Sequence, residues 1–358
     1  MMRILVATDA WRPQLNGVVR TLTEVRRCAK EFDAELTFIT PDDFPTVPLP
    51  TYPGIRVALP APRKIADRIL ALRPNAIHVA TEGPIGFLVR RYCLRHGLPF
   101  TTSFHTRFPE YVSARLPIPE RWTWAALRRF HNAGAGIMAA THALQFELAG
   151  RGFRNIVLWP RGVDAELFRP RPDASLGLQR PVFLTVGRLA VEKNLEAFLS
   201  LALPGTKVVV GEGPARAELE RRFPEAVFLG ARDGEALAAT YAAADVFVFP
   251  SRTDTFGLVL LEALASGVPI AAFAVAGPRD VIGDAAVGAL DSDLGAACTK
   301  ALTLSREACR AFALTMTWRR SARCFIANVR RCCIGPAAPR PEKPRIGVGA
   351  SLHTEPGV

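Results

Sequence analysis

The feature that most constrains the fold of this chain is an alternation of strand and helix patterns in two successive rounds. Short apolar segments are followed by amphipathic segments, in which apolar residues recur at steps of three and four positions. Strands separated by helices predict parallel sheets covered on both faces, and therefore an α/β fold. The predicted strands are 3–8, 36–40, 76–79, 100–103 and 137–140 in the first round, and 182–186, 207–210, 226–229 and 246–250 in the second.

The length of the chain suits a two-domain organisation. Its 358 residues are enough for two domains of ordinary size, and a linker with few buried-type residues is expected at 161–172. The Pro-rich segment 41–62 is expected to be a loop, 309–331 a last helix, and 335–358 a disordered tail. The other predicted helices are 18–32, 63–72, 86–96, 143–150, 192–199, 215–222, 234–243 and 258–265.

Several classes of protein are excluded by what the sequence lacks. No run of about 18 apolar residues occurs, which argues against a transmembrane helix, and the apolar N-terminal stretch is too short for a signal peptide. The seven cysteines include no Cys-x-x-Cys pair, so we expect free thiols in a reducing compartment and no zinc site. These observations predict a cytoplasmic protein.

Positive charge is concentrated in the first half of the chain. The net charge is +12, and residues 1–168 hold 22 Lys and Arg against 14 Asp and Glu. Nucleic acid, an anionic membrane surface and a phosphorylated substrate all fit this asymmetry, and so do arginines that are merely solvated. The sequence has no recognition helix, zinc pattern or aromatic RNA-binding strand, so we predict no nucleic-acid partner.

The richest motif, 251–267, follows the predicted strand 246–250 directly. It therefore lies at the carboxyl edge of a sheet, where open α/β folds bind their ligands. Gly257 precedes a helix whose first amides can bind phosphate or sugar oxygens, and it lets a ligand approach the backbone. Asp254 and Glu262, eight residues apart, can bracket a ligand with many hydroxyl groups.

Two further motifs follow strands of the same round. Arg188 and Lys193 lie five residues apart after the strand 182–186, and such a pair suits a diphosphate. Gly211 and Gly213 follow the next strand and allow a nucleobase or ribose close to the backbone. They lack the third glycine of a dinucleotide-binding motif, and no P-loop motif occurs in the chain.

The first round offers two more candidates. Gly17 follows Asn16 at the start of a predicted helix, where its amide can reach an anion from the other domain. His105 comes just after the strand 100–103 and can be a hydrogen-bond or charge partner of a reacting hydroxyl. In isolation, a histidine in this position is more often structural.

Taken together and in order, these motifs resemble those of the retaining GT-B glycosyltransferases of family 4. The similarity runs from residue 3 to about residue 329 and is greatest to GDP-mannose-dependent α-mannosyltransferases and to glycolipid glycosyltransferases. It rests on the segments 9–19, 104–106, 161–164, 187–194, 211–214 and 254–267.

The resemblance implies a GT-B fold, in which two Rossmann-like doubly wound domains face each other across a cleft. Residues 1–168 would form the N-terminal acceptor-binding domain and 169–315 the nucleotide-sugar-binding domain. The segment 316–334 would be a C-terminal crossover helix that packs back on the first domain.

The resemblance also implies a donor site for a nucleoside diphosphate sugar. Arg188 and Lys193 would hold the diphosphate, Gly17 would touch its β-phosphate, and Glu262 would bind the ribose. The hard step is stabilisation of charge on the departing diphosphate, which these cations and helix N-termini can supply without a metal or another cofactor.

The transferred hexose would lie among catalytic residues at the same edge. Asp254, with the backbone of Phe256, Gly257 and Leu258, would hold the hexose, and His105 would lie near the anomeric carbon. The family retains the anomeric configuration, and the usual proposal is a front-face attack assisted by the leaving phosphate. The commonest family pattern has Glu where this chain has Asp254, a shorter side chain that bears on which sugar is bound.

The acceptor is expected to be a lipid or a glycan. Arginines interleave with Trp122, Trp124, Leu127 and Phe130 on a predicted helix, which suits peripheral attachment to anionic lipid on the inner face of the plasma membrane. The alternative is that these aromatic residues face the core. Other activities considered are a UDP-glucose enzyme that makes a glycolipid, an epimerase, a phosphorylase and an inactive nucleotide-sugar-binding protein.

Overall fold

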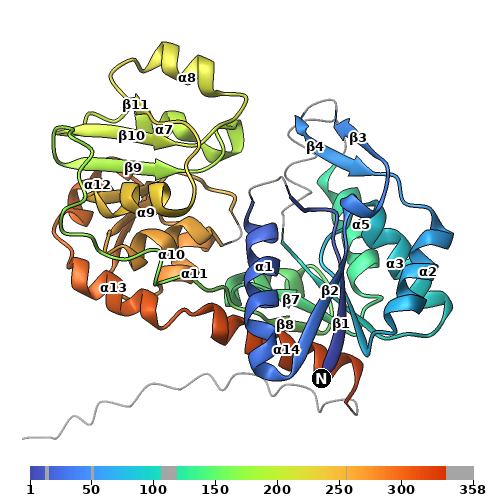
Figure 1. Ribbon diagram of the computed structural model, residues 1–358. Coiled ribbons are helices and arrows are strands. Elements are labelled where there is room, and N and C mark those ends of the chain that lie inside the picture. The colour runs from blue at the N-terminus through green and yellow to red at the C-terminus, as the bar shows by residue number, and fades with distance from the viewer. Residues whose placement is uncertain (13–15, 50–51, 106–118, 255, 336–358) are drawn as a thin grey trace, which may run out of the picture.

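The computed structural model describes residues 1–12, 16–49, 52–105, 119–254 and 256–335 (Figure 1). The predicted tail, apart from Gly335, lies outside the described residues. The described part contains two parallel six-stranded sheets, and we call the parts built on them the first and second domains.

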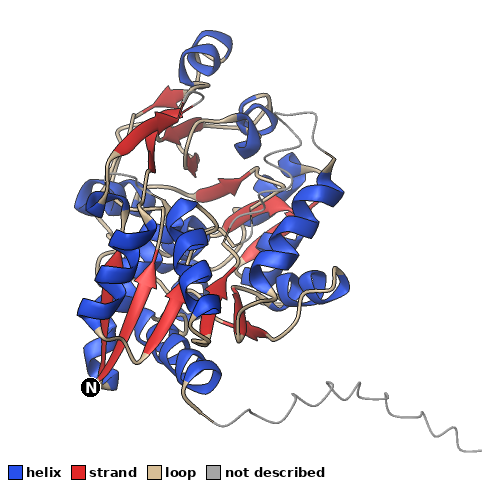
Figure 2. Cartoon of the chain, turned by 90° about the vertical axis from the view of Figure 1, so that its right-hand side faces the viewer, coloured by secondary structure: helices blue, strands red, loops and turns tan. Residues whose placement is uncertain are grey.

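The first sheet has the strand order β2-β1-β5-β6-β7-β8. Its strands are β1 (Met2–Ala7), β2 (Ala34–Ile39), β5 (Ala76–Val79), β6 (Phe100–Ser103), β7 (Gly136–Ala139) and β8 (Ile156–Leu158). The inner strands β5, β6 and β7 are buried on both faces because helices flank the sheet (Figure 2). The helices of this domain are α1 (Gly17–Ala29), α2 (Pro62–Leu72), α3 (Pro84–Arg95), α5 (Glu120–His131) and α6 (His142–Gly150).

The second sheet repeats this architecture in the order β11-β10-β9-β12-β13-β14. Its strands are β9 (Val182–Val186), β10 (Thr206–Val210), β11 (Val227–Phe228), β12 (Val246–Phe249), β13 (Ile270–Phe273) and β14 (Gly288–Asp291). Its helices are α7 (Leu195–Leu199), α8 (Arg216–Arg222), α9 (Gly234–Ala242), α10 (Leu258–Ala265), α11 (Ala276–Ile282), α12 (Leu294–Ala301) and α13 (Arg306–Leu314). The prediction of an α/β protein with two parallel sheets is confirmed.

The last helix, α14 (Trp318–Cys333), returns to the first domain and packs beside α1 and β5–β7 (Figure 1). Its Trp318 and Phe325 are buried in one cluster with Trp159, which follows β8. Helix α14 therefore completes the core of the first domain.

The predicted last helix at 309–331 is two helices, α13 and α14. The helix is interrupted between them, where the Met316 carbonyl accepts a hydrogen bond from the Val163 amide at 2.9 Å. Thr317 then begins α14, and its hydroxyl accepts from the Arg320 amide at 3.2 Å. The segment 161–163, predicted as a linker with few buried-type residues, is buried against this junction.

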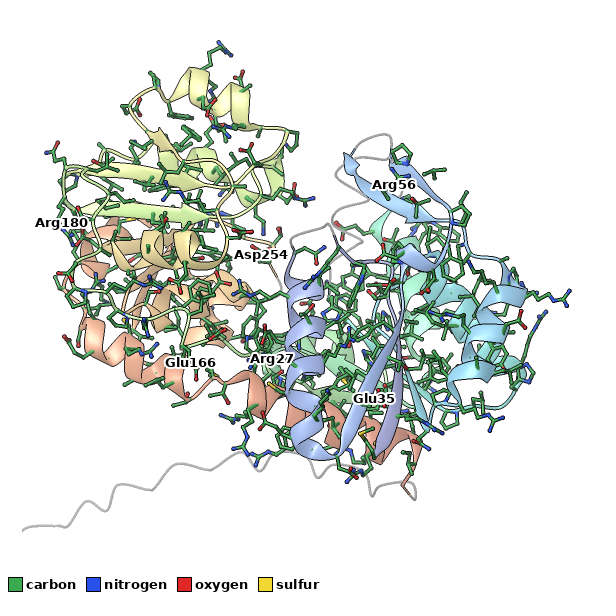
Figure 3. All side chains as sticks on the ribbon, in the orientation of Figure 1. Arg27, Glu35, Arg56, Glu166, Arg180 and Asp254 are labelled. Carbon is green, nitrogen blue, oxygen red and sulfur yellow. The ribbon has the colours of Figure 1, made fainter. Side chains whose placement is uncertain are left out.

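The predicted loop at 41–62 contains a two-stranded antiparallel hairpin, β3 (Thr46–Leu49) and β4 (Tyr52–Ala58). Pro48 pairs with Arg56, and a two-stranded ribbon tolerates proline because each strand has a free edge. The Arg56 side chain donates to the Thr46 hydroxyl at 2.6 Å and to the Thr46 carbonyl at 3.0 Å (Figure 3).

Three strands of the sheets were not expected. They are β8, β13 and β14, which are short or contain small residues in place of the β-branched run that predicts a strand.

We expect Gly162→Ala to destabilise the junction between the first domain and α14. A Cβ at this position would lie 2.4 Å from the Trp318 backbone nitrogen, and overpacking of this kind costs about 1–3 kcal/mol. The variant should melt several degrees below the unmodified protein in calorimetry. Gly150→Ala is the control, because a Cβ there meets no atom within 4 Å; equal melting temperatures for both variants would contradict the packing described here.

Candidate functional site

The first turns of two helices, one from each domain, lie next to each other. A Cβ on Gly17, the first residue of α1, would lie 3.6 Å from Leu258 Cδ1 at the start of α10. Asn16 caps α1, and its side-chain oxygen accepts from the amides of Val18 and Val19 at 3.0 Å each. Although Asn16 takes two amides of α1, both helix N-termini carry partial positive charge and the Gly17 amide lies beside them, so the place where they meet is suited to an anion.

Gly257 sets the direction of α10. Its φ of 81° lies in the left-handed region that favours glycine, and a Cβ would come within 3.0 Å of the Phe249 ring. Phe256, the residue before it, packs its half-buried side chain against the core of the second domain. Any contact of Phe256 with a ligand is therefore expected through its backbone.

The predicted cation Lys193 and the predicted carboxylate Asp254 form an ion pair. Lys193 Nζ lies 2.7 Å from Asp254 Oδ1 and 2.8 Å from Oδ2. Asn194 holds the two loops together, since its side-chain amide donates to the Pro250 carbonyl at 3.1 Å. Asp254 lies on the side of the second domain that faces α1 (Figure 3).

The second predicted cation, Arg188, is also paired. Its guanidinium contacts the Glu192 carboxylate four residues later. Both site cations thus have a carboxylate partner in the protein, and a bound diphosphate has to compete with those carboxylates for them.

Gly211 and Gly213 satisfy a packing requirement within the second domain. A Cβ on Gly211 would lie 1.9 Å from the Gly187 carbonyl oxygen, and one on Gly213 would lie 2.3 Å from that of Leu189. The space beside these glycines is filled by the loop after β9. Their predicted closeness to a nucleobase or ribose stays a prediction, whereas the structure shows that the missing side chains let the backbone of Gly187 and Leu189 pack closely against them.

Glu262 is a buried carboxylate that both domains bind. The residue is only 3% exposed to solvent. Its Oε2 accepts a hydrogen bond from the Tyr241 hydroxyl at 2.9 Å, and its Oε1 forms an ion pair with the Arg20 guanidinium of α1. Burial first, and then the Glu262 charge, raise the pKa of Tyr241 well above its ordinary value. Tyr241 therefore keeps its proton and donates a hydrogen bond to the Glu262 carboxylate.

Sequence reasoning missed Arg20 and Tyr241. Arg20 follows Gly17 by three positions on α1, so both face the same side of the helix, and this spacing was the available signal. Nothing in the sequence pattern places Tyr241 beside Glu262, because that contact depends on how α9 packs against α10.

His105 lies at the carboxyl end of β6 in the first domain. Its Nδ1 accepts from the Arg161 guanidinium at 3.2 Å, and its ring lies 5.8 Å from that of Trp159. Burial first, and the neighbouring Arg161 charge second, lower the pKa of His105 well below its ordinary value. His105 is therefore a neutral group at physiological pH.

The helix predicted to carry an aromatic membrane-facing surface turns most of that surface inward. Trp124, Leu127 and Phe130 of α5 are buried, and Trp124 packs on Phe104 and Phe153. Trp122 alone among the four predicted apolar residues is exposed, at 63%. The prediction was wrong for three of them because they face the core of the first domain.

Comparisons with known proteins identify the chemistry of this arrangement. Residues 15–167 match the model of Glycosyltransferase Family 4, and residues 180–305 match that of Glycosyl transferases group 1. A GDP-mannose-dependent alpha-mannosyltransferase of Mycobacterium tuberculosis is 32% identical over 308 residues, which are 78% of this chain and 81% of that protein. The chain belongs to glycosyltransferase family 4.

Other relatives of this glycosyltransferase widen the comparison. An alpha-monoglucosyldiacylglycerol synthase of Streptococcus pneumoniae is 25% identical over 348 residues, which cover 84% of the chain and 78% of that protein. The solved structure of sucrose-phosphate synthase from Thermosynechococcus elongatus superposes with a TM-score of 0.75 at 19% identity, covering 92% of this chain and 98% of that one. The glycosyltransferase has the GT-B fold predicted from its sequence.

We expect Arg20→Met to destabilise the glycosyltransferase by about 1–3 kcal/mol, because a buried carboxylate loses its cation. Arg27→Met, on the same helix but with an exposed side chain, is the control. The double variant Arg20→Met/Glu262→Gln should recover part of the loss, since a neutral amide needs no cation. Thermal unfolding of the unmodified protein, these three variants and the single variant Glu262→Gln measures this, and effects of the two single substitutions that simply add in the double variant would show that the two residues do not interact.

Proposed function

We propose that this glycosyltransferase transfers a hexose, with mannose favoured, from a nucleoside diphosphate sugar to a lipid or glycan acceptor, with retention of configuration. The observation that carries the proposal is the convergence of Lys193, Asp254 and the N-termini of α1 and α10 between the two domains. The name of the M. tuberculosis relative supports GDP-mannose as the donor. UDP-glucose is the second candidate, because the S. pneumoniae relative is named as a glucosyl-lipid synthase.

In the proposed reaction the cations change partners. The donor's diphosphate takes Lys193 from Asp254 and Arg188 from Glu192, and the two helix N-termini donate their amides to its oxygens. Asp254 is then released to accept hydrogen bonds from the hexose hydroxyls, and Glu262 accepts those of the ribose. The proposal assigns no step to a metal.

The transfer itself forms one bond and breaks one. The acceptor oxygen bonds to the anomeric carbon on the face from which the diphosphate oxygen departs, which retains the configuration. The acceptor's hydroxyl proton passes to the leaving phosphate, so no protein nucleophile is required.

Donor-dependent thermal shifts test the proposed donor and its site. Among GDP-mannose, UDP-glucose, GDP and UDP, we expect GDP-mannose to raise the melting temperature most, because binding to the native state stabilises it. Lys193→Ala and Glu262→Ala should remove the shift, whereas Lys300→Ala, an exposed lysine on α12, should keep it. Full shifts in the first two variants would remove the site assignment, and a larger shift with UDP-glucose would replace the donor.

We propose further that the first domain docks on an anionic membrane surface at the cytoplasmic side, where it would meet a lipid acceptor. Among the described residues, no helix combines the length and the apolar character needed to cross a bilayer. Helix α3, on the side of the first domain away from the second, exposes Phe87 and Leu94 at 52% and 49% beside Arg91 and Arg95 (Figure 1). Apolar side chains flanked by arginines suit peripheral binding to anionic lipid.

Vesicle flotation tests this docking surface. The protein should float with vesicles that contain phosphatidylglycerol and less with pure phosphatidylcholine, and salt should weaken the binding. Phe87→Ser/Leu94→Ser should reduce flotation severalfold, whereas Leu314→Ser, an equally exposed leucine of α13, should not. Absence of salt-sensitive flotation would exclude the proposed docking.

A further inference from the structure

Arg161 is a buried guanidinium that its surroundings hold in one position. Arg161 is only 5% exposed to solvent. Its guanidinium lies over the Trp159 ring, 4.3 Å from the ring centroid, and its Nη1 donates a hydrogen bond to the Trp159 carbonyl at 2.6 Å. The next residue, Gly162, packs on the backbone of Trp318. Burial lowers the pKa of Arg161 to about 9, so the group still carries its charge at neutral pH.

This fixed guanidinium determines which nitrogen of His105 carries the proton. Arg161 Nη2 lies 3.2 Å from His105 Nδ1, and a guanidinium has donors only. Nδ1 must therefore accept with its lone pair, and the single proton of the neutral imidazole must be on Nε2. A proton added to Nδ1 would break this hydrogen bond and place two positive charges in contact.

Two other titratable groups of the described first domain act on His105 in the same direction. His78 and His131 each lower the pKa of His105, as Arg161 does. His78 is buried between the hydroxyls of Thr101 and Ser103, at 2.8 and 3.0 Å. Glu82 is a carboxylate near these histidines. It accepts a hydrogen bond from His131 Nε2 at 3.0 Å, so its partner is the His131 ring and not the His105 ring.

We propose that Arg161 is a positioning residue that holds His105 in its neutral, Nε2-protonated tautomer, so that His105 donates a hydrogen bond and does not act as the base. The tautomer follows from the contacts of Arg161 alone, whereas its catalytic meaning rests on the proposed hexose transfer. In that transfer the acceptor's proton goes to the leaving phosphate, and His105 Nε2–H stabilises an oxygen of the reacting sugars or phosphate.

Histidine ¹⁵N NMR of the full-length chain tests the tautomer without any substrate. His105→Asn identifies the signals of His105 by their loss. The unmodified protein should show an acceptor-type Nδ1 and a protonated Nε2 that persist below the pH at which an ordinary histidine takes up its second proton. A protonated Nδ1 at neutral pH would overturn the proposal.

Variants at Arg161 separate positioning from general structure. Arg161→Met removes the donor, so His105 should populate both tautomers and titrate at higher pH, whereas Arg161→Lys should restore the acceptor-type Nδ1. Arg151→Met is the matched control, because Arg151 lies over the Trp124 ring at 4.0 Å and should leave the His105 signals unchanged. If Arg161→Met does not fold, the unmodified protein and the Lys variant still decide the question.

Kinetics connect the tautomer to the reaction. Arg161→Met should lower kcat about tenfold, with little change in KM for the donor, and should add an acidic limb to the pH–rate profile. If Arg161→Met loses the Nε2-protonated tautomer of His105 but keeps its kcat and its pH–rate profile, the proposed role of this tautomer in the transfer is overturned. Absence of hexose transfer by the unmodified protein would refute the proposed function. The NMR experiment would then still decide whether Arg161 holds His105 in the Nε2-protonated tautomer.

Discussion

The arrangement of the two domains depends on one buried carboxylate, that of Glu262, which is stabilised by contacts from both domains. Glu262 is buried in the second turn of the second domain's helix α10, and burial of a charge is unfavourable without a partner. Tyr241 supplies a hydrogen bond from the same domain, but the opposite charge comes from Arg20 on α1 of the first domain. Separation of the domains would therefore expose the pair to water or leave a charge unpaired.

The same contact positions the rest of the candidate site. Arg20 lies one turn along α1 from Gly17, and Glu262 lies one turn along α10 from Leu258. When the charged pair forms, the two helix N-termini are brought together at the edge where Lys193 and Asp254 meet. One interaction between helices thus sets the position of Glu262, proposed above to bind the ribose, and of the proposed diphosphate site.

Much of this arrangement could be predicted because it is local in sequence. The strands that precede Arg188 and Asp254 are apolar runs, and a residue that follows a parallel strand has to lie at the carboxyl edge of its sheet. Partners across the domains could not be predicted in this way. The Arg20–Glu262 pair joins residues 242 positions apart, and the inward direction of Trp124 depends on the packing of Phe104 and Phe153. The hairpin at 46–58 was not predicted because prolines usually mark loops. A two-stranded ribbon tolerates proline, because it needs few of the backbone hydrogen bonds that proline cannot donate.

Helix α14 has a consequence for how the protein is made. Trp318 and Phe325 of α14 fill the same cluster as Ile4 and Trp159 of the first domain, although the second domain lies between Trp159 and Trp318 in the sequence. Synthesis of the entire second domain must come between these two parts of one core. An apolar face of the first domain therefore stays uncovered until Trp318 and Phe325 have been synthesised, and such a face is prone to aggregation during that interval.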